Sequence, residues 1–205
     1  MTNLIDKSYF YKLAEQNPED LCKRSLCKYN ARKKIYTLSV WGNEYDIHTL
    51  ERKIECISNH YEGPHEYFNL FIIYYLLQVK NIKIKGEWIS EKDLPGGPTF
   101  FRGPHKIPTY LISDRYGNRI EAFRRRCEQL HGIAVNMADA AYHFSIAPHI
   151  PVAVLYWIGD EEFPPEAKIL YDRTIARHLS LDIIFALSIE ICTRIGKEPN
   201  KHAHN

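Results

Sequence analysis

The chain has 205 residues, of which 45% are hydrophobic and 25% charged, and this ordinary globular mixture excludes a fibrous or largely disordered protein. A formal net charge of +2 gives no overall field that would favour nucleic acid or a membrane surface. We expect one domain over residues 1–196 and a polar C-terminal tail over 197–205.

The N-terminal part predicts two short helices followed by a hairpin. Residues 7–29 alternate apolar and charged positions at helical spacing, and Asn17-Pro18 is typical of the start of the second helix. Residues 34–40 and 44–48 are rich in β-branched and aromatic side chains. They flank Trp41-Gly42-Asn43, which indicates a hairpin turn.

The middle of the chain predicts a buried helix, a strand and a loop. Residues 49–58 are ambiguous, and 59–65 have the composition of a turn. Residues 66–80 are apolar on more than one side, which places this helix in the interior as the central helix. Residues 82–88 alternate like a strand, and 94–109 contain too many prolines and glycines for regular structure.

The last part predicts one more helix, a sheet core and a C-terminal helix. A helix is expected over 118–131, with Gly132 as its C-cap residue. Another is expected to begin at Ser180 and end near Ile195. Between these helices lie three predicted strands, 141–146, 151–157 and 167–172. The order indicates an α+β fold: a mixed or antiparallel sheet with a buried central helix and flanking helices.

The segment 95–105 is the strongest candidate for a ligand site, because loops of such composition commonly hold a ligand. Glycine lets the backbone approach a ligand, a guanidinium matches carboxylate or phosphate, and an imidazole binds metals or moves protons. We expect the guanidinium and the imidazole to share one enclosed space. The alternative is an Ω-loop pinned to the core by its phenylalanines. The candidate residues are Gly97, Thr99, Phe100, Phe101, Arg102 and His105.

A second candidate follows the predicted strand that ends at Trp157. Asp160, Glu161 and Glu162 are adjacent carboxylates, which could bind a hard cation or share acid/base work. A solvated β-turn has the same composition, and we favour it because the ligand alternation of a calcium loop is absent.

The histidines and cysteines give no complete metal or nucleophile motif. No histidine has H-E-x-x-H spacing, and His105 is the best single candidate for a metal ligand because of its loop. The five cysteines lack a C-x-x-C pair, so we expect reduced thiols, a cytoplasmic protein and no intrinsic iron–sulfur cluster. Cys22 and Cys27 are interpreted as small buried apolar residues. No signal peptide or membrane span is expected.

Two motifs carry a resemblance to a known family. They are the run from Gly96-Gly97 through Thr99-Phe100-Phe101-Arg102-Gly103-Pro104-His105 and the run Trp157-x-Gly159-Asp160-Glu161-Glu162-Phe163-Pro164, followed by Tyr171-Asp172 and His178-Leu179. The chain resembles a domain of unknown function of anaerobic bacteria and archaea. Some members of that family are joined to an iron–sulfur motif similar to that of corrinoid proteins.

The resemblance and the loop together lead to one hypothesis and two alternatives. The hypothesis is a cofactor-binding accessory protein of anaerobic metabolism that holds a corrinoid (cobalamin) or haem-like tetrapyrrole. His105 would be its axial ligand and Arg102 its propionate or amide partner, with Phe100, Phe101, Trp157 and Asp160 around the ring. A protein of a corrinoid or iron–sulfur system would be its partner. The alternatives are an enzyme using His105 with Asp160 or Glu161 as acid and base, and a non-catalytic protein-interaction domain.

Overall fold

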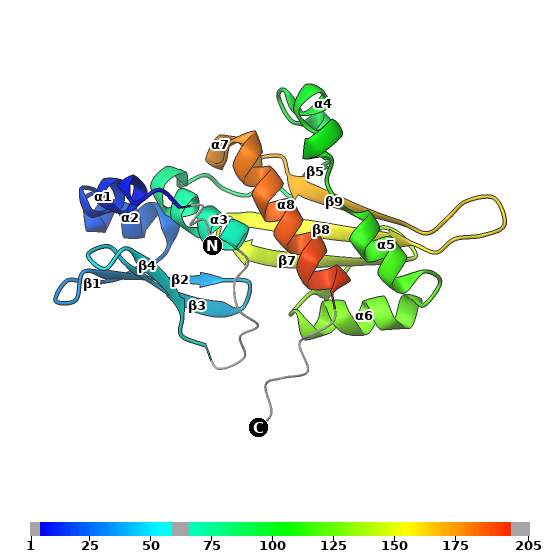
Figure 1. Cartoon of the computed structure of the whole chain (residues 1–205), viewed down its shortest axis with the longest axis horizontal. Coiled ribbons are helices and arrows are strands. Elements are labelled where there is room, and N and C mark those ends of the chain that lie inside the picture. Colours follow the sequence, from blue (N-terminus) through cyan, green and yellow to red (C-terminus); the bar gives the residue numbers. More distant parts are fainter. Residues whose placement is uncertain (1–4, 59–65, 198–205) are drawn as a thin grey trace.

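The computed structural model describes residues 5–58 and 66–197 and has an α+β fold with two antiparallel sheets (Figure 1). The predicted class is confirmed, including the buried central helix and the flanking helices. The domain limits at 1–196 stay a prediction. The predicted turn at 59–65 and residues 198–205 of the predicted tail lie outside the described residues.

Two short helices come first, as predicted: α1 (Ser8–Ala14) and α2 (Pro18–Ser25). The side-chain oxygen of Asn17 accepts hydrogen bonds from two amides of the first turn of α2, at 2.9 and 3.2 Å. Pro18 fits the first helical position because no amide hydrogen is needed there. Leu26 ends α2 with a φ of 58°, in the left-handed region, so the chain turns back after the helix.

Sheet A is an antiparallel meander in sequence order. The predicted hairpin is confirmed, with Trp41 and Gly42 as its two-residue loop at φ values of 48° and 73°. Positive φ at both positions is what a type I′ turn requires. The two outer strands are short and carry little burial pattern, so periodicity did not reveal them. The strands are β1 (Lys28–Asn30), β2 (Ile35–Val40), β3 (Asn43–His48) and β4 (Lys53–Cys56).

Trp41 connects this hairpin to the rest of the molecule. Its amide donates to the carbonyl of Ile146 at 2.8 Å, and its indole Nε1 donates to the carbonyl of Leu130 at 2.9 Å. Its ring lies edge-on to Phe144, with centroids 5.5 Å apart. The two sheets therefore contribute to one continuous hydrophobic core.

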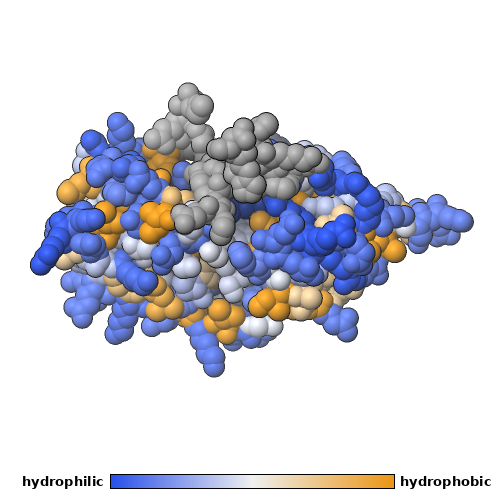
Figure 2. Space-filling view, turned by 90° about the horizontal axis from the view of Figure 1, so that it is seen from below, coloured by the Kyte–Doolittle hydropathy of each residue, from blue (hydrophilic) through white to orange (hydrophobic). Residues whose placement is uncertain are grey.

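Sheet B has the strand order β5-β9-β8-β7-β6, and all its neighbours are antiparallel. Its three long strands are those predicted, and β8 is buried up to its last residue, Trp157. The hairpin of β8 and β9 extends beyond the body of the molecule, and its tip projects in Figures 1 and 2. The strands are β5 (Trp88–Ile89), β6 (Ile133–Ala134), β7 (Ala140–Ala147), β8 (Ile150–Trp157) and β9 (Glu166–Asp172).

The predicted strand 82–88 is wrong except at its end, because only Trp88–Ile89 pairs with a neighbour. The buried carboxylate of Asp172 explains the difference. It accepts hydrogen bonds from the amides of Lys85 (3.3 Å) and Gly86 (2.6 Å), so these backbone donors are bound to a side chain. The amides of this segment therefore have hydrogen-bond acceptors without a neighbouring strand.

The prediction that 94–109 lacks regular structure is also wrong. The segment contains the helical turns α4 (Gly97–Phe100) and η2 (Gly103–His105), preceded by η1 (Glu91–Asp93). Pro98 and Pro104 stand in the first turns, where proline is tolerated. Two further helices, α5 (Tyr110–Tyr116) and α7 (Ile175–His178), were not predicted either.

The longer helices match the predictions closely: α3 (Glu66–Gln78), α6 (Ile120–Gln129) and α8 (Leu181–Gly196). α3 is buried as expected, with Phe68, Phe71 and Ile72 among its inaccessible side chains. α8 and α5 lie over one face of sheet B (Figure 1). α6 ends in a Schellman motif whose left-handed residue is His131 at φ 61°, not the predicted Gly132.

Candidate functional site

The loop that carries the first motif folds on itself at two glycines. Gly96 has a φ of 79°, and its carbonyl accepts the amide of Phe100 at 3.0 Å. Gly97 is buried, and a Cβ there would lie 1.9 Å from the carbonyl oxygen of Glu91. Glycine is therefore required at position 97 by contact with η1 rather than by room for a ligand.

The backbone amides of the loop are bound within the loop. Gly97 donates to Leu94, Phe101 donates to Gly97, and His105 donates to Arg102, at 2.8 to 3.0 Å. The amide of Thr99, an exposed residue, also has a partner in the carbonyl of Gly96. Because these donors are already used, a ligand at this loop would meet side chains rather than a cradle of amides.

Four rings form what we call the aromatic platform: Phe100, Phe101, His105 and, from α8, Phe185. The imidazole of His105 lies nearly parallel to the ring of Phe100, with centroids 4.6 Å apart and planes at 15°. Phe185 meets the imidazole edge-on, at 5.3 Å and 89°. Phe101 is in edge contact with Phe100 at 5.0 Å. The imidazole is thus held in one orientation by two neighbouring rings.

The guanidinium and the imidazole of the loop lie on the surface. Both Arg102 and His105 are exposed, so the enclosed space predicted for them is an open surface instead. Among the described residues, neither the guanidinium of Arg102 nor the imidazole of His105 has a hydrogen-bond or ion-pair partner in the protein. The platform therefore offers an imidazole and a guanidinium to a ligand from solvent.

The residues of the second motif lie elsewhere. Trp157 packs in a small separate cluster with Leu155 and Ala153 on sheet B. Asp160 is exposed and accepts the amides of Glu162 and Phe163, each at 2.8 Å, which is the turn that we favoured. These two hydrogen bonds, that from Phe163 first, lower the pKa of the Asp160 carboxyl.

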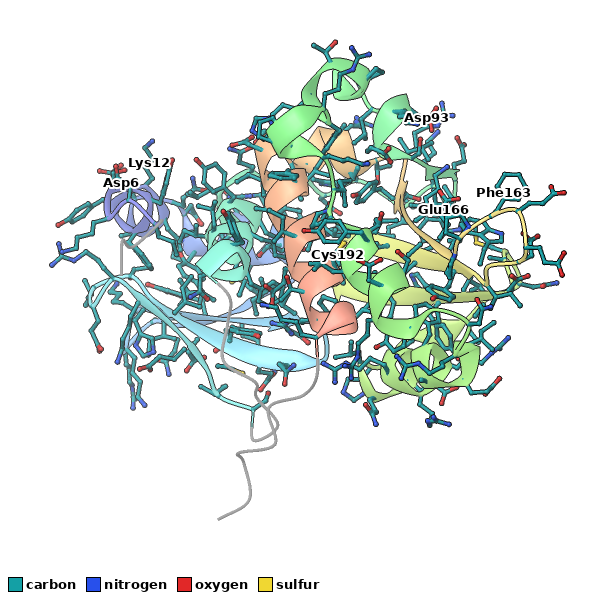
Figure 3. All side chains as sticks on the ribbon, turned by 45° about the vertical axis from the view of Figure 1, so that its right-hand side comes forward. Asp6, Lys12, Asp93, Phe163, Glu166 and Cys192 are labelled. Carbon is teal, nitrogen blue, oxygen red and sulfur yellow. The ribbon has the colours of Figure 1, made fainter. Side chains whose placement is uncertain are left out.

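The two motifs are therefore not brought together. α4, at the top of Figure 1, is well separated from the tip of the β8–β9 hairpin at the right. Figure 3 places Phe163 at that tip and Asp93, next to the loop, on another part of the surface. An acid/base pair of His105 with Asp160 or Glu161 has no support from this arrangement.

A family model matches residues 17–194. This range includes the whole loop 95–105, the β8–β9 hairpin and α8 up to Arg194. Its description is a domain of unknown function, DUF3786. The chain belongs to this family. Neither a curated protein nor a solved structure matches it.

The DUF3786 fold holds no cluster of metal-ligand type in its described part. Among residues 5–58 and 66–197, no three His, Cys, Asp or Glu side chains gather as they would around a metal ion. Over the same residues, none of the helices combines the length and the apolar character needed to cross a bilayer.

Sequence reasoning missed Phe185, the member of the platform that α8 contributes. Its position looks like any other apolar position of α8, because Phe185 stands in the continuous apolar run from Ile183 to Leu187. Only the packing of the loop on α8 reveals its role, through edge contacts with Phe100, Phe101 and His105.

Proposed function

We propose that this DUF3786 protein is a cofactor-binding accessory protein of anaerobic metabolism, whose aromatic platform holds a corrinoid or haem-type tetrapyrrole. The observation that carries the proposal is the state of His105. Its imidazole is exposed, is stacked on Phe100 at 4.6 Å, and has no hydrogen-bond partner among the described residues. An imidazole held by its ring face keeps its nitrogens available as an axial ligand.

The neighbouring side chains fit the rest of such a ligand. Arg102 stands three residues away with a free, exposed guanidinium that would pair with a propionate carboxylate or donate a hydrogen bond to an amide oxygen. Phe100, Phe101 and Phe185 add apolar ring surface beside the imidazole. Bound tetrapyrrole supplies the metal chemistry, and the chain's own residues position it.

Trp157 and Asp160, predicted from sequence as part of the same site, are not included in this proposal. Trp157 packs in its own cluster, and Asp160 is bound within its turn. The binding surface is therefore reduced to the platform and Arg102.

An open platform also suits an accessory role. A ring bound by one face to an exposed surface would leave its other face accessible to a second protein. The partner that we propose is a protein of a corrinoid or iron–sulfur system, which would receive or deliver the cofactor.

A titration followed by visible absorption tests whether the platform binds tetrapyrroles. The full chain, purified without oxygen, is titrated with ferric haem and separately with aquocobalamin. The proposal predicts a saturable band shift with one of them at one equivalent, weakened in Arg102→Ala. Arg173→Ala, which removes an exposed arginine that is paired with Glu87 and is not part of the platform, serves as the matched control and should leave the shift intact. No band shift with either compound would contradict the proposal.

A further inference from the structure

Two thiols meet where α2 ends. The left-handed conformation of Leu26 folds the chain back over the last turn of the helix, and the amide of Leu26 donates to the carbonyl of Cys22 at 2.8 Å. Cys27 is thereby returned to the side of the helix that carries Cys22. The two Sγ atoms are 3.6 Å apart, which is van der Waals contact without a covalent bond.

One of the two thiols is open to small molecules. Cys22 is half-buried and Cys27 is buried, and both line an open surface pocket of about 530 Å³. The other lining residues come from the start of α2 and from β1, and include Asn17, Glu19 and Lys28. Of the two lining cysteines, Cys22 is the more accessible residue.

The remaining cysteines have no such arrangement. Cys127 and Cys192 are fully buried, and Cys56 is half-buried on β4. Within residues 5–58 and 66–197, no second pair of cysteine sulfurs is in contact. The contact between Cys22 and Cys27 is therefore not repeated between other cysteines of the described residues.

We propose that Cys22 and Cys27 form a redox-active dithiol, which a small-molecule disulfide converts into an intramolecular disulfide. In the first step the thiolate of Cys22 attacks one sulfur of the small disulfide, its S–S bond breaks, and the departing thiolate takes a proton from water. In the second step Cys27 releases its proton to water, and its sulfur attacks Sγ of Cys22. The second small thiolate leaves and is protonated. The protein is oxidised by two electrons, and the small disulfide is reduced to two thiols.

Burial affects the second step. Desolvation raises the pKa of the Cys27 thiol to about 12, so this thiol is protonated at neutral pH. Ring closure is therefore expected to be slower than the attack by Cys22, and to accelerate as the pH rises. Cys27 is the resolving residue, since it already lies at 3.6 Å from the sulfur that it attacks.

Mass spectrometry of the full chain tests the dithiol. The reduced protein is incubated with glutathione disulfide at mildly alkaline pH until its mass is constant, and is then mapped by non-reducing peptide digestion. We expect a loss of about 2 Da, for the two thiol hydrogens, and a cross-linked peptide pair that contains Cys22 and Cys27. Dithiothreitol should restore the original mass.

Matched variants separate the roles of the two thiols. Cys27→Ser should stop at the mixed disulfide on Cys22, whereas Cys22→Ser should remain unmodified at Cys27. Cys56→Ser, which removes another half-buried thiol, should oxidise as the wild type does. A wild-type protein that ends as a mixed disulfide, or a cross-link that involves Cys56, would overturn the proposal. The wild-type experiment stands by itself if a variant fails to fold.

Discussion

The imidazoles of His149 and His178 are stacked, with ring centroids 5.8 Å apart and planes at 14°. Both residues are buried, at 8% and 2% exposure. Nδ1 of His178 accepts the amide of Lys80 at 3.3 Å, so the neutral ring is the one that fits. Burial, followed by the charges of His149, Arg177 and Lys80, lowers the pKa of His178 to about 4, against an opposing effect of Asp172.

This pair predicts a loss of stability in acid. His178 binds a proton in the unfolded chain below about pH 6.5, but in the folded chain only below about pH 4. The contribution of the neutral ring to the free energy of unfolding is therefore complete above pH 6.5 and is lost as the pH falls from 6.5 to 4. We expect His178→Asn to reduce the fall in the free energy of unfolding between pH 7 and pH 4 by about 2 kcal/mol. Urea denaturation at several pH values measures the free energy of unfolding. Exposed His131→Gln serves as the control. If the free energy of unfolding of His178→Asn falls with pH as steeply as that of the wild type, His178 does not have this role.

A buried ion pair within α8 predicts a non-additive pair of mutations. Nε of Arg194 lies 2.5 Å from Oε1 of Glu190, whose side chain is 2% exposed, and the guanidinium lies over the rings of Phe68 (4.2 Å) and Trp41 (5.1 Å). Arg194→Met should cost about 3–5 kcal/mol because it leaves a buried carboxylate alone. Adding Glu190→Met should recover most of that loss in a double-mutant cycle by urea denaturation. Additive costs would count against a coupled pair.

The close contact of Gly97 with η1 predicts that one added methyl group lowers the free energy of unfolding. The Cβ of an alanine there would be 1.9 Å from the carbonyl oxygen of Glu91, so Gly97→Ala should cost about 3 kcal/mol or more and displace α4 from η1. Gly103→Ala is the matched control: its φ is 52°, and its Cβ would meet open space. We expect about 1–2 kcal/mol there, from backbone strain alone. Equal costs in thermal or urea unfolding would show that the contact at position 97 is unimportant.

A substitution of Phe185 tests the contribution of α8 to tetrapyrrole binding. Phe185→Ala removes the edge contact with His105 at 5.3 Å and frees the imidazole to turn. We expect the affinity for the tetrapyrrole to fall about tenfold, with the circular dichroism spectrum unchanged. Phe163→Ala, at the exposed tip of the β8–β9 hairpin (Figure 3), should leave the affinity as it is. If both variants bind alike, the platform is not the binding surface.

The parts of the fold that sequence predicted are those that local chemistry determines. Asn17 before Pro18 indicated the start of α2, and Trp41-Gly42 between two β-branched runs indicated the hairpin. The strand expected at 82–88 failed because the carboxylate of Asp172, far along the chain, binds the amides of that segment. No local pattern carries that information.

The candidate site could likewise be predicted only where its residues lie close together along the chain. Phe100, Phe101 and His105 lie within one short loop, and the structure brings their rings together. Phe185 joins them only through tertiary packing, and Trp157 belongs to a different cluster although its motif looked equally distinctive. Residue types near a turn indicate available chemistry, whereas the contact between distant segments depends on the whole fold.

The most direct test of the central claim is the ligation of His105. The full chain and His105→Ala are each loaded with ferric haem and with cob(II)inamide, which lacks a nucleotide base of its own. Electron paramagnetic resonance then shows whether a protein nitrogen coordinates the metal. We predict a nitrogen-coordinated signal with the wild type that is lost in His105→Ala and kept in His131→Ala. The same signal in His105→Ala as in the wild type would contradict the assignment.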